Sequence, residues 1–332
     1  MPEPAGKVAD SFETRIRELE EHSLSPLAVR SYETRGRVRA EKPCRLRTPF
    51  QRDRDRVVHS KAFRRLAHKT QVFIDPEGDH FRTRLTHTLE TTGISRGVAR
   101  TLRLNEDLTE AIGLGHDLGH TPFGHAGEKA LSAILSEKFG RSFRHNEHSL
   151  RVVDVLERDG RGLNLTAEVR DGILNHTGEN EPRALEGKIV RLVDRVAYIN
   201  HDIDDAIRAG AVRASDLPSG AIALLGDSGS RRIDRLVHDI VESSSEAGDI
   251  VQSDEISEAM LSLRRFMFDR VYLSSHTEAQ NEHATLVVRT LFCHLLEHPE
   301  AIPEKEGETV ERATDYLAGM TDRFALALFE SI

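Results

Sequence analysis

The sequence has few of the residues that mark secreted, disulfide-bonded or membrane proteins. Two of its 332 residues are cysteines, Cys44 and Cys293, which offer neither a disulfide framework nor a cysteine-rich zinc site. It contains no run of about 18 apolar residues, so we expect no membrane span. Its first residues lack the apolar core of a signal peptide. These absences predict a soluble, cytoplasmic protein.

Charge is distributed unevenly along the chain. The net charge is −9, yet residues 1–70 contain 17 Lys and Arg against 10 Asp and Glu, so this segment carries +7 and the remainder −16. A basic segment of this kind can bind polyanions such as nucleotides or nucleic acid. It can equally form a solvated face or a subunit contact, and the sequence leaves both interpretations open.

The hydrophobic pattern is helical almost throughout. We expect a first helix at about 11–22, an irregular Arg-rich arm at 30–56, a short hairpin at 72–74, and helices from residue 85 onward. One helix begins near Asp107 with a capping-box variant, and a long helix spans about 186–209. Segments 210–232 and 243–248 are interpreted as loops, and three amphipathic helices follow them. The predicted fold class is all-α.

One stretch carries most of the chemistry. Histidines and an aspartate crowd the segment His116-Asp117-Leu-Gly-His120-Thr-Pro-Phe-Gly-His125-Ala-Gly-Glu128, and His87 precedes it on another predicted helix. Imidazole and carboxylate groups together suit a divalent ion. Adjacent helical residues point about 100° apart, so His116 and Asp117 can flank one ion only at a helix end or beside a second helix. A single histidine in isolation would more simply be a hydrogen-bonded core residue.

The long predicted helix supplies a fourth candidate ligand, Asp194. Tyr198 and Asp202 follow at intervals of four, which aligns polar groups along one side of a helix that is otherwise buried. The set His87, His116, Asp117 and Asp194 resembles the metal site of HD-domain phosphohydrolases. The surrounding residues resemble one branch of these proteins closely, the bacterial dGTPase-like deoxynucleoside triphosphate triphosphohydrolases.

This resemblance, which covers roughly residues 24–275, implies roles for further residues. His125, Glu128 and His145 match catalytic residues of the family, although His125 and Glu128 could also form a hydrogen bond at a helix start. Arg84 matches a phosphate-binding arginine, and Gln71 and Val72 match a pair that reads the deoxyribose. The resemblance places further substrate contacts at Arg195, Tyr198, Asp202, Arg264 and Tyr272. For Arg195, Arg264 and Tyr272 a salt bridge or core contact is an equal alternative.

The family implies metal-dependent hydrolysis of dNTPs to deoxynucleoside and inorganic tripolyphosphate, which would control the dNTP pool. We favour one divalent ion (Mn²⁺, Mg²⁺, Fe²⁺, Co²⁺, Ni²⁺ or Zn²⁺), although His120, His145 and His148 are extra ligands in reach by chain order. The resemblance further implies a homo-oligomer and a dNTP activator. At 332 residues the chain is shorter than the longer dGTPases, which leaves dGTP preference open.

Two other functions remain open at this point. An HD phosphohydrolase of another nucleotide, such as a monophosphate, a cyclic nucleotide or ppGpp, explains the metal ligands equally well. A nucleic-acid-binding regulatory protein would explain the basic arm, so nucleic acid is a candidate partner that the enzymatic reading does not require. The expected organisation is a basic arm (1–56), an HD-domain core (57–210) and a helical C-terminal extension (211–332).

Overall fold

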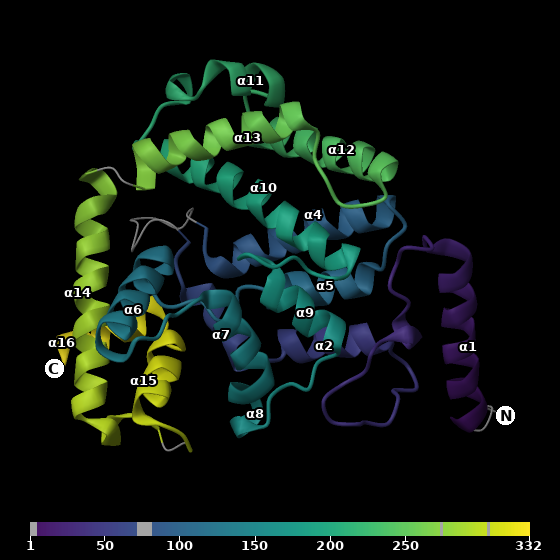
Figure 1. Ribbon diagram of the computed structural model, residues 1–332, viewed down its shortest axis with the longest axis horizontal. Coiled ribbons are helices and arrows are strands. Elements are labelled where there is room, and N and C mark those ends of the chain that lie inside the picture. Colours follow the sequence, from purple (N-terminus) through teal and green to yellow (C-terminus); the bar gives the residue numbers. More distant parts are fainter. Residues whose placement is uncertain (1–4, 72–81, 273–274, 304–305) are drawn as a thin grey trace.

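The computed structural model describes residues 5–71, 82–272, 275–303 and 306–332, with side chains omitted at 5–11 and 275–277. The described residues form helices joined by turns, and their only β-type pairings are isolated bridges between Arg37 and Thr166 and between Thr70 and Thr83. The all-α prediction is confirmed (Figure 1). Val72 and the hairpin predicted at 72–74 lie outside the described residues.

The centre of the molecule is built from helices that pack around α5 and α10. These are α2 (Pro49–Val58), α4 (Arg84–Thr101), α5 (Glu106–Gly115), α9 (Ala167–Asn175) and α10 (Leu185–Arg208). Their inward faces are apolar, for example Phe50, Leu108, Ile112 and Ile173, which are fully buried. Shorter helices extend this layer: α3 (Lys61–Arg65), α7 (His145–Arg151), a π-helical turn (Val152–Leu156) and α8 (Glu157–Gly160).

Two further groups of helices lie against this centre (Figure 1). The helices α11 (Ser219–Leu225), α12 (Gly229–Ala247) and α13 (Asp254–Met267) share a hydrophobic core with α4 and α10. At the left of the view, α6 (Gly124–Phe139) shares a separate core with α14 (Ser275–Glu297), α15 (Thr309–Ala318) and α16 (Asp322–Glu330). The N-terminal helix α1 (Ala5–Ser23) lies at the opposite edge from α14.

Several predicted boundaries were wrong. The cap of α5 is Asn105, whose side chain accepts from the Leu108 amide 3.1 Å away, so the predicted start at Asp107 is two residues late. Segment 243–248 is mostly helical because Leu236, Ile240 and Ser244 recur at intervals of four on the buried face of α12. The last predicted helix is two helices, α15 and α16, and the arm at 30–56 already becomes helical at Pro49.

Candidate metal and nucleotide site

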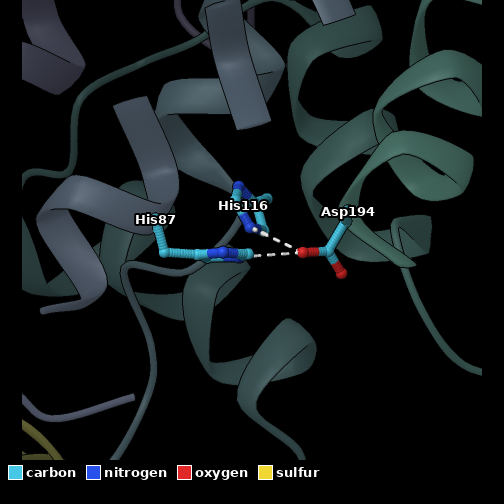
Figure 2. A group of neighbouring side chains, drawn as sticks. All are labelled: His87, His116 and Asp194. Carbon is cyan, nitrogen blue, oxygen red and sulfur yellow. Dashed lines mark hydrogen bonds and ion pairs between the residues drawn. The ribbon is translucent and has the colours of Figure 1, made fainter. Parts of the chain in front are cut away.

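The metal ligands predicted from three separate segments meet at one point. His87 comes from the first turn of α4, His116 caps the C-terminal end of α5, and Asp194 lies on α10. Figure 2 shows the three side chains pointing toward one another. Asp194 Oδ1 lies 3.0 Å from His87 Nε2 and 3.6 Å from His116 Nε2. One potential ligand atom from each residue lies within 4.8 Å of the others, which fits a single ion.

The hydrogen bonding of His116 fits a metal ligand. Its Nδ1–H donates to the Gly113 carbonyl at 2.6 Å, which leaves the buried Nε2 as the nitrogen that can bind a metal, and Nε2 has no hydrogen-bond partner among the described residues. Metal-binding histidines are commonly oriented in this way. Burial lowers the pKa of His116, but the charges of Asp117 and Asp194 outweigh it and raise that pKa to about 9. Metal binding at this nitrogen would therefore displace a proton.

Asp117, the fourth predicted ligand, lies beside this group. Its Oδ1 is 3.5 Å from His116 Nε2 and 3.3 Å from His120 Nε2, while its Oδ2 accepts a hydrogen bond from Arg84 Nη1 at 3.0 Å. One carboxylate oxygen of Asp117 therefore faces the proposed metal ligand His116, and the other is hydrogen-bonded to Arg84. Burial raises the pKa of Asp117, but the opposing charges of His116, His120 and Arg84 keep that pKa well below its usual range.

A second cluster joins Asp117, His120 and His145. The rings of His120 and His145 are stacked, with centroids 3.9 Å apart and planes inclined by 14°. An imidazole nitrogen binds a metal through a lone pair in the plane of its ring. One ion cannot lie in both of these nearly parallel planes, so this arrangement favours a single ion at the first cluster.

Glu128 lies between two of the predicted catalytic histidines. Its carboxylate accepts hydrogen bonds from the His145 backbone N–H at 2.8 Å and from His145 Nδ1 at 3.0 Å, whereas His125 Nδ1 is 3.6 Å away. The side chain of His125 is 73% exposed, while that of His145 is 14% exposed. Glu128 thus orients His145 more directly than His125. Burial raises the pKa of Glu128, but its contacts with His125 and His145 lower that pKa well below its usual range.

Arg84 and Gln71 both lie close to the backbone of Gly124. Arg84 is 1% exposed, and within the described part of the chain its Nε and Nη2 atoms have no hydrogen-bond partner. Gln71 Oε1 is likewise buried and unpaired. A Cβ on Gly124 would come within 2.8 Å of the Gln71 carbonyl and 3.1 Å of Arg84 Nη2, so a glycine is required at this close approach. The guanidinium of Arg84 and the backbone of Gln71 are therefore both held close to Gly124, and Arg84 also contacts Asp117 beside the His87, His116 and Asp194 cluster.

Two polar residues on one side of α10, Tyr198 and Asp202, interact with residues of the C-terminal region. The hydroxyl of Tyr272 donates a hydrogen bond to Asp202 Oδ2, and the positive charge of Arg264 acts on Tyr198, opposing the rise in the Tyr198 pKa that burial causes. Burial raises the pKa of Asp202 to about 7, although the Tyr272 hydrogen bond acts in the opposite direction. Arg195, in contrast, is exposed on the outer side of α10. The structure thus gathers Tyr198, Asp202, Arg264 and Tyr272, and leaves Arg195 apart from them.

Comparison with known proteins gives the same picture. Residues 84–199 match the HD domain, and residues 250–331 match a phosphohydrolase-associated domain. The chain is 54% identical to the deoxyguanosinetriphosphate triphosphohydrolase-like protein of Caldanaerobacter subterraneus subsp. tengcongensis, over 95% of this chain and 94% of that one. Proteins of the same name from Desulfatibacillum aliphaticivorans and Clostridium tetani are 45% and 43% identical, over 98% and 97% of this chain and 97% and 96% of theirs.

The chain belongs to the deoxyguanosinetriphosphate triphosphohydrolase-like family. The resemblance inferred from the motifs is therefore confirmed, as is the HD-domain fold. Among the described residues of this family member, no helix combines the length and apolarity needed to cross a membrane.

The basic N-terminal segment of this family member is largely paired internally. Arg37 contacts the buried Asp53, Arg35 pairs with Glu168, and Arg52 pairs with Glu41 at 2.8 Å. Arg47, Arg54 and Arg56 also have carboxylate partners. Most of these charges are neutralised within the fold, which favours a structural role for the segment over polyanion binding.

The sequence did not single out two histidines that contact this site. His176 Nε2 lies 3.2 Å from His145 Nε2, and its Nδ1 donates to the Ile173 carbonyl at 2.7 Å. His201 Nδ1 lies 3.5 Å from Nδ1 of the metal-ligand candidate His87. A usable signal existed for His201, because it follows Asp194 by seven residues, two helical turns, and so shares its side of α10.

Proposed function

We propose that this protein hydrolyses deoxynucleoside triphosphates, dGTP or other dNTPs, to the deoxynucleoside and inorganic tripolyphosphate, and so controls the dNTP pool. The observation that carries the proposal is that buried polar atoms of Gln71, Arg84 and His116 have no hydrogen-bond partner among the residues that the structure describes. Unpaired buried groups cost roughly 1–3 kcal/mol each, so a ligand that pairs them is expected. A sugar, a phosphate and a metal supply the matching groups, and the names of the relatives support the same substrate class.

His87, His116, Asp117 and Asp194 would hold one divalent ion, because their oxygen and nitrogen atoms converge and His116 Nε2 is free to bind. These ligands suit Mn²⁺, Mg²⁺, Fe²⁺, Co²⁺, Ni²⁺ or Zn²⁺. Such an ion neutralises phosphate charge and lowers the pKa of a bound water.

The protein's own groups would do the rest of the chemistry. Arg84, fixed on Asp117 by its Nη1, directs two unpaired N–H groups at a phosphate as water attacks the α-phosphorus. His125 exchanges a proton with water or with the leaving 5′-oxygen, and Glu128 and His145 form the hydrogen-bonded support beside it.

The sugar would lie between Gln71 and the stripe of Tyr198, Asp202 and Tyr272. The Gln71 amide would bond the 3′-hydroxyl. A pocket built around one hydroxyl strongly rejects analogues that leave its polar groups unpaired. Arg264, and Arg195 with less structural support, would contact the triphosphate. Val72, outside the described residues, keeps its predicted role of excluding a 2′-hydroxyl.

The test is ion-exchange chromatography of products after incubation with each dNTP, singly and mixed, with Mn²⁺ or Mg²⁺. We expect deoxynucleoside plus tripolyphosphate, abolished in Asp194→Ala and retained in Asp234→Ala, whose carboxylate lies 76% exposed on α12. Intact dNTPs in every mixture would refute the proposal, and release of phosphate from another nucleotide would favour the alternative HD hydrolase.

The same mixtures address the proposed activator and assembly. Turnover that requires a second dNTP would support an activator site, and light scattering with and without dNTP would test the proposed homo-oligomer. Turnover of each single dNTP by a monomer would contradict both.

A further inference from the structure

One carboxylate of the C-terminal region accepts hydrogen bonds from two segments that flank the candidate site. Asp322, at the first position of α16, is 8% exposed. Its Oδ2 accepts hydrogen bonds from the Thr70 amide at 2.9 Å and the Thr70 hydroxyl at 2.7 Å, and its Oδ1 accepts from the Phe123 amide at 3.0 Å. Thr70 directly precedes Gln71, and Phe123 is two residues before His125.

Lys69 adds a second connection at the same junction. It is 2% exposed, and its ammonium group donates to the carbonyls of His120 and Ala318, the latter at 2.8 Å. The Lys69 carbonyl in turn accepts from the Arg84 amide at 3.0 Å. Segment 69–71 is therefore held to the His120 loop, to the start of α4 and to the loop between α15 and α16.

The loop that Asp322 holds is one that needs support. Phe123 has a φ of +61°, a left-handed conformation that a bulky residue rarely adopts. Its side chain is buried in the core that α6 shares with α14, α15 and α16. The next residue, Gly124, approaches the Gln71 carbonyl so closely that an added Cβ would lie 2.8 Å from it. A small shift of this loop would therefore move His125 relative to Gln71.

We propose that Asp322, which lies outside the HD domain, is a positioning residue that fixes the sugar-reading segment at Gln71 against the start of α6, whose first turn carries His125. This inference rests on the proposed dNTP hydrolysis. It gives the C-terminal region a defined part in the reaction: the region sets the separation between the groups that read the deoxyribose and the group that moves the proton. Misplacing a reacting group by about 1 Å can lower a rate on the order of a hundredfold.

The decisive variant is Asp322→Asn, which keeps the size of the side chain and turns one of its two acceptors into a donor. The matched control is Asp315→Asn. Asp315 is similarly buried (its side chain 9% exposed) and also ties the C-terminal region to the core, through Arg151 at 2.7 and 2.8 Å. It contacts neither segment 69–71 nor the loop at 123–125 in the described hydrogen bonds.

Three measurements separate positioning from stability: the melting temperature, kcat and KM for a dNTP and its ribonucleotide, and amide hydrogen exchange of Thr70 and Phe123. For Asp322→Asn we expect kcat at least tenfold lower, a smaller preference for the dNTP, and faster exchange at both amides. Asp315→Asn should lower the melting temperature while leaving the preference and both amides unchanged. If Asp322→Asn does not fold, Thr70→Val, which removes only the hydroxyl bond, should change the preference in the same direction.

The inference would be overturned if Asp322→Asn kept the wild-type preference for the dNTP. It would also be overturned if Asp322→Asn and Asp315→Asn lowered kcat and the dNTP preference to the same extent. If the wild type hydrolyses no dNTP, the proposed function fails separately. In that case amide hydrogen exchange alone tests the positioning role of Asp322. Faster exchange at Thr70 and Phe123 in Asp322→Asn but not in Asp315→Asn would support this role, and unchanged exchange at both amides would overturn it.

Discussion

The buried carboxyl of Asp202 makes the free energy of unfolding depend on pH. Burial raises the pKa of this carboxyl from 3.8 to about 7 in the folded protein. The folded state therefore binds more protons than the unfolded state between these two values, and the free energy of unfolding falls as pH rises through that window. A shift of this size corresponds to about 4 kcal/mol, with the full loss reached above pH about 7.

Asp202→Asn tests this directly because asparagine carries no charge at any pH. With a chelator present to exclude metal, urea unfolding of wild type and variant should be compared from pH 4 to pH 8.5. The variant should gain stability relative to wild type by about 4 kcal/mol across this range. In a Tyr272→Phe background, which removes the hydrogen bond that favours ionised Asp202, the gain should shift to higher pH. A wild-type-to-variant difference that is constant with pH would refute the reasoning.

Three shorter predictions follow. Arg37→Ala removes the cation that pairs with the fully buried Asp53, so it should lower the free energy of unfolding in urea by about 3–5 kcal/mol. Arg47 is half-exposed, and Arg47→Ala should lower that free energy by less than about 1 kcal/mol. Equal losses in the two variants would contradict a structural role for the arm. Gly119→Ala places a Cβ 2.1 Å from a backbone nitrogen of α7, so it should lower stability by about 3 kcal/mol and reduce turnover, unlike an alanine at the open Gly97. Elemental analysis should find about one metal per chain, lost in His116→Ala; two ions per wild-type chain would contradict the single site.

The convergence of the proposed metal ligands was predictable because they occupy positions that local rules define. A helix that ends at His116 presents both His116 and Asp117, and the interval of four on α10 aligns Asp194 with Tyr198 and Asp202. Each of these rules can be applied to a single helix without knowing how the helices pack. His176 escaped prediction because it belongs to no such interval, and only the packing of α7 against α9 brings it within 3.2 Å of His145.

The wrong prediction of a loop at 243–248 has a different cause. The run of serine and glutamate at 243–246 has a loop-like composition, yet Leu236 and Ile240 on the same helix are fully buried against α10 and its neighbours. Tertiary burial of an amphipathic face thus outweighs weak local propensity. The contacts of Asp322 with Thr70 span 252 residues of sequence, a separation at which no periodic pattern carries information.

The candidate active site is completed from both sides by the C-terminal region. Arg264 and Tyr272 reach Tyr198 and Asp202 from one side, while Asp322 holds the segments next to Gln71 and His125 from the other. Two hydrophobic cores join these helices to α4, α10 and α6, so their removal would expose apolar faces of the very helices that carry the metal and catalytic residues. In the proposed mechanism the metal ligands alone would not define the catalytic unit. It would extend to α16, because the groups proposed to position a nucleotide depend on contacts that the HD domain does not make by itself.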